Sequence, residues 1–380
     1  MRVFINAIFA HILLNAYVFW RGRQIIPLKR AYRLSFYALF VGELTIYTFG
    51  FIFVDEISID LLYPVMLIGT SWAVFLLYMT GFLAVYDAIS YLKKRLNLLP
   101  ELNLSALPAR RIYYAISAAA VALIMCCGNY RFRHPAVTEV NLGINKPAPF
   151  KELKIVMAAD IHAGYMVNGK TLKMYIDRIM EQKPDLILLV GDIIDYDIRP
   201  LDEQRMDTLF RRLKAPLGVY ASTGNHEYRL DGEAKISWLK EKAGLTMLRD
   251  SVVKVAGAFY IVGREDDKAP ARKKLKELMR QVDKSKPVIV INHEPKRLQE
   301  EADEQVDMAF YGHTHGGQIF PYNLVIDLLY ELGYGYKKKG DTHIYVTSGL
   351  GLSGPQYRIG TLSEIVVIKA RFETERQTPF

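Results

Sequence analysis

The sequence predicts a layered α/β domain that follows a region of four membrane-spanning helices. Hydrophobic residues make up 51% of the 380 residues, and nearly all of the apolar excess lies before residue 130. From residue 151 onward, short apolar strands alternate with helical segments, which is the pattern of a mixed α/β protein. We therefore expect a transmembrane region (1–130), a linker (131–150) and an α/β domain (151–372).

Four apolar stretches lie in the first region, and a span needs about 20 mainly apolar residues. A cleavable signal peptide explains the first stretch poorly, because three more stretches follow and no small-residue cleavage site ends it. Two ionisable residues, His11 and Glu43, lie within the stretches, and we expect them to face the bundle interior and bond another helix. The predicted spans lie near residues 3–20, 34–54, 61–86 and 112–128.

The loops between these stretches alternate in charge. The first loop carries five basic residues and no acidic one, the second carries three acidic residues and no basic one, and the third carries five basic residues against two acidic ones. Basic loops stay in the cytoplasm. We therefore expect the first and third loops to face the cytoplasm, and the domain after residue 130 to be extracytoplasmic.

Charge and cysteine content exclude two kinds of site in the later domain. Residues 131–380 carry 38 Lys and Arg against 34 Asp and Glu, so they lack the basic excess of a nucleic-acid binder. The two cysteines, Cys126 and Cys127, end the last apolar stretch. The domain can therefore hold neither a disulfide framework nor a thiolate metal site, and we expect the pair to fill a helix end rather than to carry a lipid.

Polar residues follow each apolar strand of the domain where that strand ends. The strands lie in "LKIVMAAD", "DLILLVGD", "LGVYASTGNHE", "KPVIVINHEP" and "VDMAFYGHTH", with others after Leu245 and His343. Ligands of α/β sheets bind beyond the carboxyl ends of strands, so these ends are the candidate sites of chemistry. The segment 131–150, which contains three prolines, reads as a linker or a first edge strand. Helices are expected over 171–182, 203–214, 234–242 and 273–282.

Five short motifs at the strand ends carry side chains that can bind metals. Gly191 allows a tight turn, and Asp192 emerges where one carboxylate can bridge two metals. A lone histidine at a strand end is more often structural than a ligand, but five of the eight histidines fall within these motifs, and so many coincidences are improbable. The motifs are Asp160-Ile161-His162, Gly191-Asp192-Ile193-Ile194-Asp195, Gly224-Asn225-His226-Glu227, Asn292-His293-Glu294-Pro295 and Gly312-His313-Thr314-His315.

This ordered set resembles the calcineurin-like metallophosphoesterase superfamily. The strings "GHTHGGQIFP" and "TSGLGLSGPQYRIG" further resemble its bacterial membrane-associated branch, and the resemblance covers about residues 150–370. It implies a layered β-sandwich flanked by helices, and hydrolysis of phosphoesters at two divalent metal ions. Two such ions about 4 Å apart lower the pKa of a bridging water and stabilise both oxygens of an in-line displacement.

The resemblance also implies a role for each motif residue. His226 would protonate the leaving oxygen or stabilise phosphoryl charge. Asp195 and Glu227 would orient ligands through hydrogen bonds, and Arg358 would contact substrate phosphate or form a structural ion pair. The mixture of nitrogen and oxygen donors suits Mn, Fe or Zn better than Ca or Mg. One metal would be held by Asp160, His162, Asp192 and His315, and the other by Asp192, Asn225, His293 and His313.

The segment 320–336 is rich in aromatic and aliphatic residues and is followed by three lysines, Lys337, Lys338 and Lys339. Because it closely follows His315, we expect it beside the mouth of the site. Its composition suits contact with a lipid interface. The alternative is a helix packed on the core of the domain.

The sequence thus predicts a membrane-anchored, extracytoplasmic phosphoesterase that hydrolyses a monoester or a diester and needs no nucleic-acid partner. An outward-facing site favours envelope lipids or polymers as substrates. A membrane-tethered metal-binding sensor without turnover is the alternative, but it should have lost a ligand or His226, and none is lost. A transporter with an accessory hydrolase is a third possibility, which the few charged residues in the spans disfavour.

Overall fold

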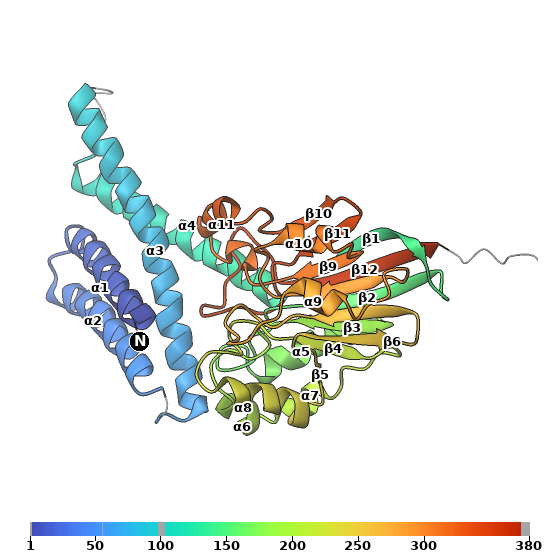
Figure 1. Ribbon diagram of the computed structural model, residues 1–380. Coiled ribbons are helices and arrows are strands. Elements are labelled where there is room, and N and C mark those ends of the chain that lie inside the picture. The colour runs from blue at the N-terminus through green and yellow to red at the C-terminus, as the bar shows by residue number, and fades with distance from the viewer. Residues whose placement is uncertain (1, 55, 98–102, 374–380) are drawn as a thin grey trace, which may run out of the picture. The chain divides into compact units, whose positions relative to one another are not determined.

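The computed structural model describes residues 2–54, 56–97 and 103–373, and the chain divides into two compact units (Figure 1). The helical unit comprises the chain up to Asn129 together with Gly354–Gln356. The α/β unit comprises Tyr130–Ser353 and the chain from Tyr357 onward. Four long helices coincide with the four predicted apolar stretches: α1 (Arg2–Arg23), α2 (Arg30–Ile52), α3 (Ile59–Leu96) and α4 (Leu107–Arg133).

Two helices, rather than the predicted four, are long and apolar enough to cross a membrane among the residues that the structure describes. They are α3 and α4. The predicted spans 3–20 and 34–54 include positions whose side chains lie outside the described residues, in α1 before residue 8 and at residue 51. The structure therefore supports a membrane region through α3 and α4.

A buried polar contact joins α1 to α2. The Nε2 atom of His11 lies 3.0 Å from Glu43 Oε2, and the amide of Asn15 donates to the same oxygen at 3.3 Å. The ring of His11 stacks on Tyr47 with 4.1 Å between centroids. The prediction that His11 and Glu43 face the interior and bond another helix is confirmed.

The α/β unit contains two six-stranded mixed sheets. The first has the order β1-β12-β2-β3-β4-β5, formed by β1 (Ala136–Pro147), β12 (Glu364–Glu373), β2 (Glu152–Ala158), β3 (Leu186–Val190), β4 (Val219–Ser222) and β5 (Thr246–Met247). The second has the order β10-β11-β9-β8-β7-β6, formed by β10 (Gly335–Lys339), β11 (Thr342–Val346), β9 (Met308–Tyr311), β8 (Val288–Ile291), β7 (Phe259–Gly263) and β6 (Ser251–Val255). Of the two alternatives for residues 131–150, the edge strand is the correct one, since β1 pairs in parallel with β12 at the sheet edge.

The two sheets pack face to face around one apolar core (Figure 1). Alternate residues of neighbouring strands enter it, among them Ile155 of β2, Leu188 of β3 and Phe310 of β9. The residues between them, such as Leu189 of β3, are equally buried on the outer face of their sheet. Strands covered on both faces read as continuous apolar runs, which explains why β3 and β8 could be predicted from sequence.

Helices cover the outer faces of the sandwich. Leu275 and Leu278 of α9, together with Leu298 of α10, form a second apolar cluster with Val288 and Val290 of β8. The other side carries α5, whose cap residue Asn168 accepts a hydrogen bond from Thr171 N. The helices are α5 (Gly169–Glu181), α6 (Arg199–Glu203), α7 (Met206–Phe210), α8 (Gly232–Ser237) continued by a π-helical turn η1 (Trp238–Lys242), α9 (Leu275–Met279), α10 (Leu298–Asp303), a 3-10 turn η2 (His315–Gly317) and α11 (Tyr322–Leu329).

The single helix predicted over residues 203–214 is wrong. The chain forms α6 and α7 instead, because Arg205 between them adopts a left-handed backbone with φ of 50°. The side chain of the preceding Gln204 accepts a hydrogen bond from Gly169 N at 2.9 Å, which ties the break to the start of α5. A contact that is remote in sequence thus accompanies a break that local helix propensity did not reveal.

Truncation of the core should weaken the α/β unit. Ile155 is fully buried between the sheets, so we expect Ile155→Ala to lower the free energy of unfolding by about 2–5 kcal/mol, and Ile155→Val by about 0.5–1.5 kcal/mol. Denaturant unfolding of the detergent-solubilised chain, followed by circular dichroism, measures both variants. Equal midpoints for Ile155→Ala and the parent chain would contradict the placement of this residue.

Candidate metal centre

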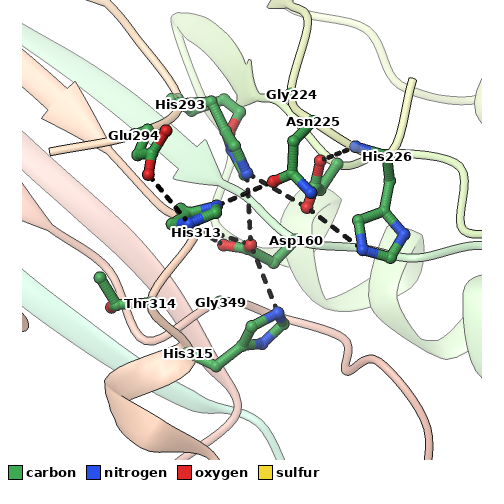
Figure 2. A network of polar contacts seen from close by, with 12 residues as sticks. Asp160, Gly224, Asn225, His226, His293, Glu294, His313, Thr314, His315 and Gly349 are labelled. Carbon is green, nitrogen blue, oxygen red and sulfur yellow. Dashed lines mark hydrogen bonds and ion pairs between the residues drawn. The ribbon is translucent and has the colours of Figure 1, made fainter. Parts of the chain in front are cut away.

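The five sequence motifs follow β2, β3, β4, β8 and β9, and the structure brings side chains of all five together; Figure 2 labels residues of four of them. Backbone hydrogen bonds join the loops directly. Asp160 N donates to Gly191 O at 3.1 Å, and His162 N donates to Asp192 O at 3.0 Å. The two sheets meet here as well, because the backbone N–H of His313 donates to the carboxylate of Asp160 at 3.0 Å.

Most of the predicted ligands sit in an unusual backbone conformation. Non-glycine residues rarely adopt positive φ, and each such residue costs about 1–3 kcal/mol. This conformation turns the chain sharply at the strand ends and aims several side chains at one point. The left-handed residues of the site are Asp160 (φ 54°), His162 (φ 51°), Asp192 (φ 49°), His313 (φ 73°) and His315 (φ 52°).

Two glycines allow the site loops to approach this closely. Gly191 has a φ of 72°, and a Cβ atom on it would lie 2.6 Å from Nδ1 of His293. Gly349, which follows β11, has a φ of 81°, and its Cβ would lie 2.8 Å from that of Asp160. The tight turn expected at Gly191 is present, whereas no strand-end motif pointed to Gly349.

The first group of donor atoms comes from Asp160, His162 and His315. The two Nε2 atoms of His162 and His315 lie 3.1 Å apart. Nε2 of His315 is also 3.5 Å from Asp160 Oδ1 (Figure 2). All three residues had been predicted as ligands of one metal.

The second group comes from Asp192, His293 and His313, with Asn225 beside them. Nε2 of His293 lies 3.1 Å from Asp192 Oδ2. Nδ1 of His313 lies 2.8 Å from the amide oxygen of Asn225. Asp192 Oδ2 is also 3.8 Å from Nε2 of His162, so this carboxylate oxygen lies between the two groups.

The hydrogen-bond network shows that these atoms fit a bound cation. Nδ1 of His293 lies 2.8 Å from the carbonyl oxygen of Val190 and must donate to it. Its Nε2 then points at the carboxylate of Asp192 at 3.1 Å, where this nitrogen either carries a proton or offers its lone pair to a cation. Donors that share a cation at about 2.1 Å lie about 3–3.5 Å apart. The 3.1 Å and 3.5 Å spacings around His315 in the first group, and the 3.1 Å spacing between His293 and Asp192 in the second, match that geometry.

Burial sets the charge of the site. It raises the pKa of Asp160 to about 6, lowers the pKa of His313 to about 4, and lowers the pKa of His315 well below its ordinary value. Burial also lowers the pKa of the His293 ring. The Asp192 carboxylate outweighs this effect and raises that pKa well above its ordinary value. The two buried carboxylates thus call for positive charge, while the neutral rings keep the lone pairs that metal ligation requires.

The carboxylate of Asp195 contacts two histidine rings. Its Oδ1 atom lies 2.9 Å from Nδ1 of His226 and 3.4 Å from Nδ1 of His162. These three residues form a further cluster of potential ligands. Because Nδ1 of His162 faces Asp195 while its Nε2 faces His315, the carboxylate orients a ring whose other nitrogen points into the first donor group.

Glu227 is fully buried and organises the backbone of two motifs. Its burial raises its pKa to about 7, and the backbone groups that donate to it act in the opposite direction. It therefore joins the loop after β3 to the loop after β4 and reaches no ligand side chain. The N–H donors to its carboxylate are those of Gly224 (2.7 Å), Ile193 (2.8 Å), Asp192 (2.9 Å) and Ile194 (3.0 Å).

His226 lies beside the donor groups. Its Nε2 atom is 4.0 Å from Asp192 Oδ2, and its backbone N–H donates to Asp192 Oδ1 at 2.8 Å. Burial lowers the pKa of its ring. Arg229, which the sequence motifs did not identify, brings its Nη1 atom to 3.4 Å from Nδ1 of this ring.

Arg358 lies directly behind the proposed ligand His315, with its Nη2 atom 3.5 Å from Nδ1 of that ring, and its contact with substrate stays a prediction. The side chain is fully buried, and burial lowers its pKa to about 10. Its guanidinium donates to backbone carbonyls rather than to a carboxylate, so it holds the loop after β11 against the loop after β9. The acceptors are Ser348 O (2.7 Å), Gly349 O (3.0 Å), His315 O (3.0 Å) and Gly351 O.

Glu294 is a site residue to which sequence reasoning gave no role. Its Oε1 atom lies 3.3 Å from Nε2 of His313, on the side of the ring opposite Asn225 (Figure 2). It thus holds the His313 ring with Nδ1 toward the second donor group. The signal was present, because Glu294 directly follows His293 within a quoted motif.

Comparison with known proteins agrees with this geometry. The sequence model of the calcineurin-like phosphoesterase family matches residues 153–317. An uncharacterized metallophosphoesterase of Helicobacter pylori is 27% identical over 94% of this chain and 95% of its own length, so the similarity extends into the helical unit. A transmembrane protein with a metallophosphoesterase domain from Danio rerio is 27% identical over 62% of this chain and 57% of that protein.

A metallophosphoesterase of Bacillus subtilis is 31% identical to this chain over 67% of the chain and 93% of its own length. The five motifs lie within residues 153–317, the segment that the family model matches. The structure also brings their histidines and carboxylates together in groups that can hold metal ions. The chain belongs to the calcineurin-like metallophosphoesterase family and is a metal-dependent phosphoester hydrolase.

Proposed function

We propose that this chain is a membrane-anchored phosphoesterase with two divalent metal ions, which hydrolyses a phosphomonoester or phosphodiester outside the cytoplasm. The observation that carries the proposal is the position of Asp192 Oδ2, 3.1 Å from one donor group at His293 and 3.8 Å from the other at His162. A sensor without turnover should have lost a ligand or His226, and every motif residue is present.

The donor groups support the ligand sets that the sequence suggested. Two divalent cations bound there would activate water for attack on phosphorus and neutralise charge on the phosphate oxygens. Their nitrogen and oxygen donors favour Mn, Fe or Zn. One ion would be held by Asp160, His162, Asp192 and His315, and the other by Asp192, Asn225, His293 and His313.

His226 is placed to assist departure of the leaving group. Its Nδ1 lies 2.9 Å from Asp195 Oδ1 and 3.2 Å from the carbonyl oxygen of Asp195, so these two oxygens fix the ring. Burial lowers the pKa of the ring, and the Asp195 carboxylate acts against this by favouring the protonated form. A proton on Nε2 is then the one available to the leaving oxygen. When the leaving group needs no proton, the same N–H group stabilises charge on the phosphoryl oxygens.

The charges around α3 and α4 support an extracytoplasmic site. The loop between these helices and its flanks carry Lys93, Lys94, Arg95, Arg110 and Arg111. Basic residues at span ends favour the cytoplasm. If α3 and α4 both cross the membrane, the α/β unit after α4 lies on the opposite side. Phosphoesters of the cell envelope, including lipids, are the substrates available there.

Loss of a metal ligand should abolish turnover. We expect Asp192→Asn and His313→Ala to lower kcat/KM on an aryl phosphate at least about 100-fold, because each removes a donor that holds the ions. Steady-state kinetics, metal analysis and circular dichroism test this expectation. Lys173→Ala, on the exposed surface of α5, is the matched control. Retained turnover in both ligand variants would refute the assignment.

The role of His226 depends on the leaving group. We expect His226→Gln to lower kcat about 100-fold or more for an alkyl leaving group, which needs a proton, and far less for 4-nitrophenolate. Bound metal should be unchanged, because this ring lies outside both proposed ligand sets. An equal loss with both leaving groups would show that His226 acts by stabilising charge instead.

Reporter fusions test the orientation of the membrane region. Fused to the end of the chain, alkaline phosphatase should be active and green fluorescent protein dark, because only the former matures outside the cytoplasm. A fusion truncated after Asn97, in the basic loop that follows α3, should give the reverse result. A fluorescent full-length fusion would place the catalytic unit in the cytoplasm and remove the argument for envelope substrates.

A further inference from the structure

Helix α11 presents an apolar surface that no other part of its unit covers. Leu328 is 86% exposed and Leu329 is 66% exposed, and Leu324 and Val325 are exposed beside them. Ile326 is the buried residue of this helix. The sequence left open the alternative that this segment packs on the core of the domain. Only Ile326 is buried in that way. Contiguous exposed apolar residues on a folded domain mark an interaction surface.

The helix is held firmly in place. Phe320 N, just before it, donates to Ile359 O at 2.8 Å. At its other end, the hydroxyl of Tyr330 donates to Glu294 Oε1 at 3.3 Å, and Glu294 in turn lies 3.3 Å from His313. The exposed leucines therefore belong to an ordered element that is tied to a proposed metal ligand.

The same helix forms one wall of an open cavity at the metal centre. The cavity has a volume of about 260 Å³, a little below the usual range of small-molecule sites, so it can receive part of a ligand and leave the rest outside. Its lining combines His313 and His315 with Tyr322, Ile326 and Leu329 of the helix. A phosphate group near the two histidines would leave the rest of its molecule against apolar side chains.

The border of the α11 surface has the composition of a lipid interface. Tyr334 and Tyr336, which follow the helix in the chain, are exposed, and aromatic rings with a polar tip favour the headgroup level of a bilayer. Lys338 is 47% exposed on β10, where a basic side chain can meet anionic headgroups. The chain also contains α3 and α4, which are apolar enough to cross a membrane.

We propose that α11 lies in the headgroup region of a phospholipid bilayer, and that the substrate is an amphiphilic phosphoester whose hydrocarbon chain passes along Tyr322, Ile326 and Leu329. This inference rests on the proposed function for the identity of the reaction. A small soluble phosphate would leave the apolar wall of the cavity and the exposed leucines without a contact. Leu324, Val325 and Leu328 enter the bilayer surface, and the cavity receives one lipid from it.

Fluorescence quenching tests the bilayer contact without reference to activity. The full chain, with Cys126 and Cys127 replaced by Ser, would carry a single cysteine at Leu328 or at Lys173, labelled with an environment-sensitive dye. In proteoliposomes of phosphatidylcholine and phosphatidylglycerol, nitroxide-labelled lipid should quench the dye at Leu328 far more than the dye at Lys173. Quenching at Leu328 no greater than at Lys173 overturns the proposal, whatever the enzyme hydrolyses.

Kinetics test the substrate class. An aryl phosphoester carrying either a methyl or a hexadecyl group on its ring, presented in vesicles, separates chain binding from chemistry. We expect Leu328→Glu to raise the KM of the hexadecyl substrate about tenfold and to leave the methyl substrate unchanged, while Leu328→Met matches the parent on both. Equal KM values for the two substrates in the parent chain would overturn the chain-binding assignment. Absence of turnover on both would instead refute the proposed function.

Discussion

The arrangement of the site depends on one electrostatic constraint, which is that two buried carboxylates must be matched by positive charge. Asp160 and Asp192 are almost completely buried at the meeting point of the two sheets. An isolated buried charge is costly unless it is paired or bound to a cation. The histidine nitrogens around them can meet this need with protons or by sharing divalent ions, and the spacing of their lone pairs suits the ions.

Residues that do not contact the proposed ions stabilise the strained loops of the site. The left-handed turns at five proposed ligands are strained, and such strain persists only where the surrounding structure fixes it. Glu227 fixes the loops after β3 and β4 through four backbone donors. Arg358 fixes the loops after β9 and β11 through carbonyl acceptors. Both are buried ionisable side chains, and both bind backbone groups.

The sequence contained most of the information on the strands and on the motifs. β3 and β8 are continuous apolar runs because both of their faces are covered, and the polar motifs directly follow them. The break at Arg205 was hidden, because its φ of 50° accompanies a contact between Gln204 and Gly169 that lies 35 positions away. The carbonyl contacts of Arg358 could not be predicted for a similar reason, since only the fold places four carbonyl groups around it. The exposure of Leu328 could not be predicted either, because the sequence of an apolar helix does not show whether another element covers it.

The place of the last strand in the first sheet has a consequence for biosynthesis. β12 lies between β1 and β2, so that Ala136, just after α4, is paired with Glu364. This sheet cannot close until β12 has been made, 228 positions after the start of β1 (364 − 136), and such long-range pairing is slow to form. The nascent unit therefore remains open while the ribosome is still adding residues. An open chain is the form that a translocation channel can thread, so this strand order is compatible with the export that the proposed topology requires.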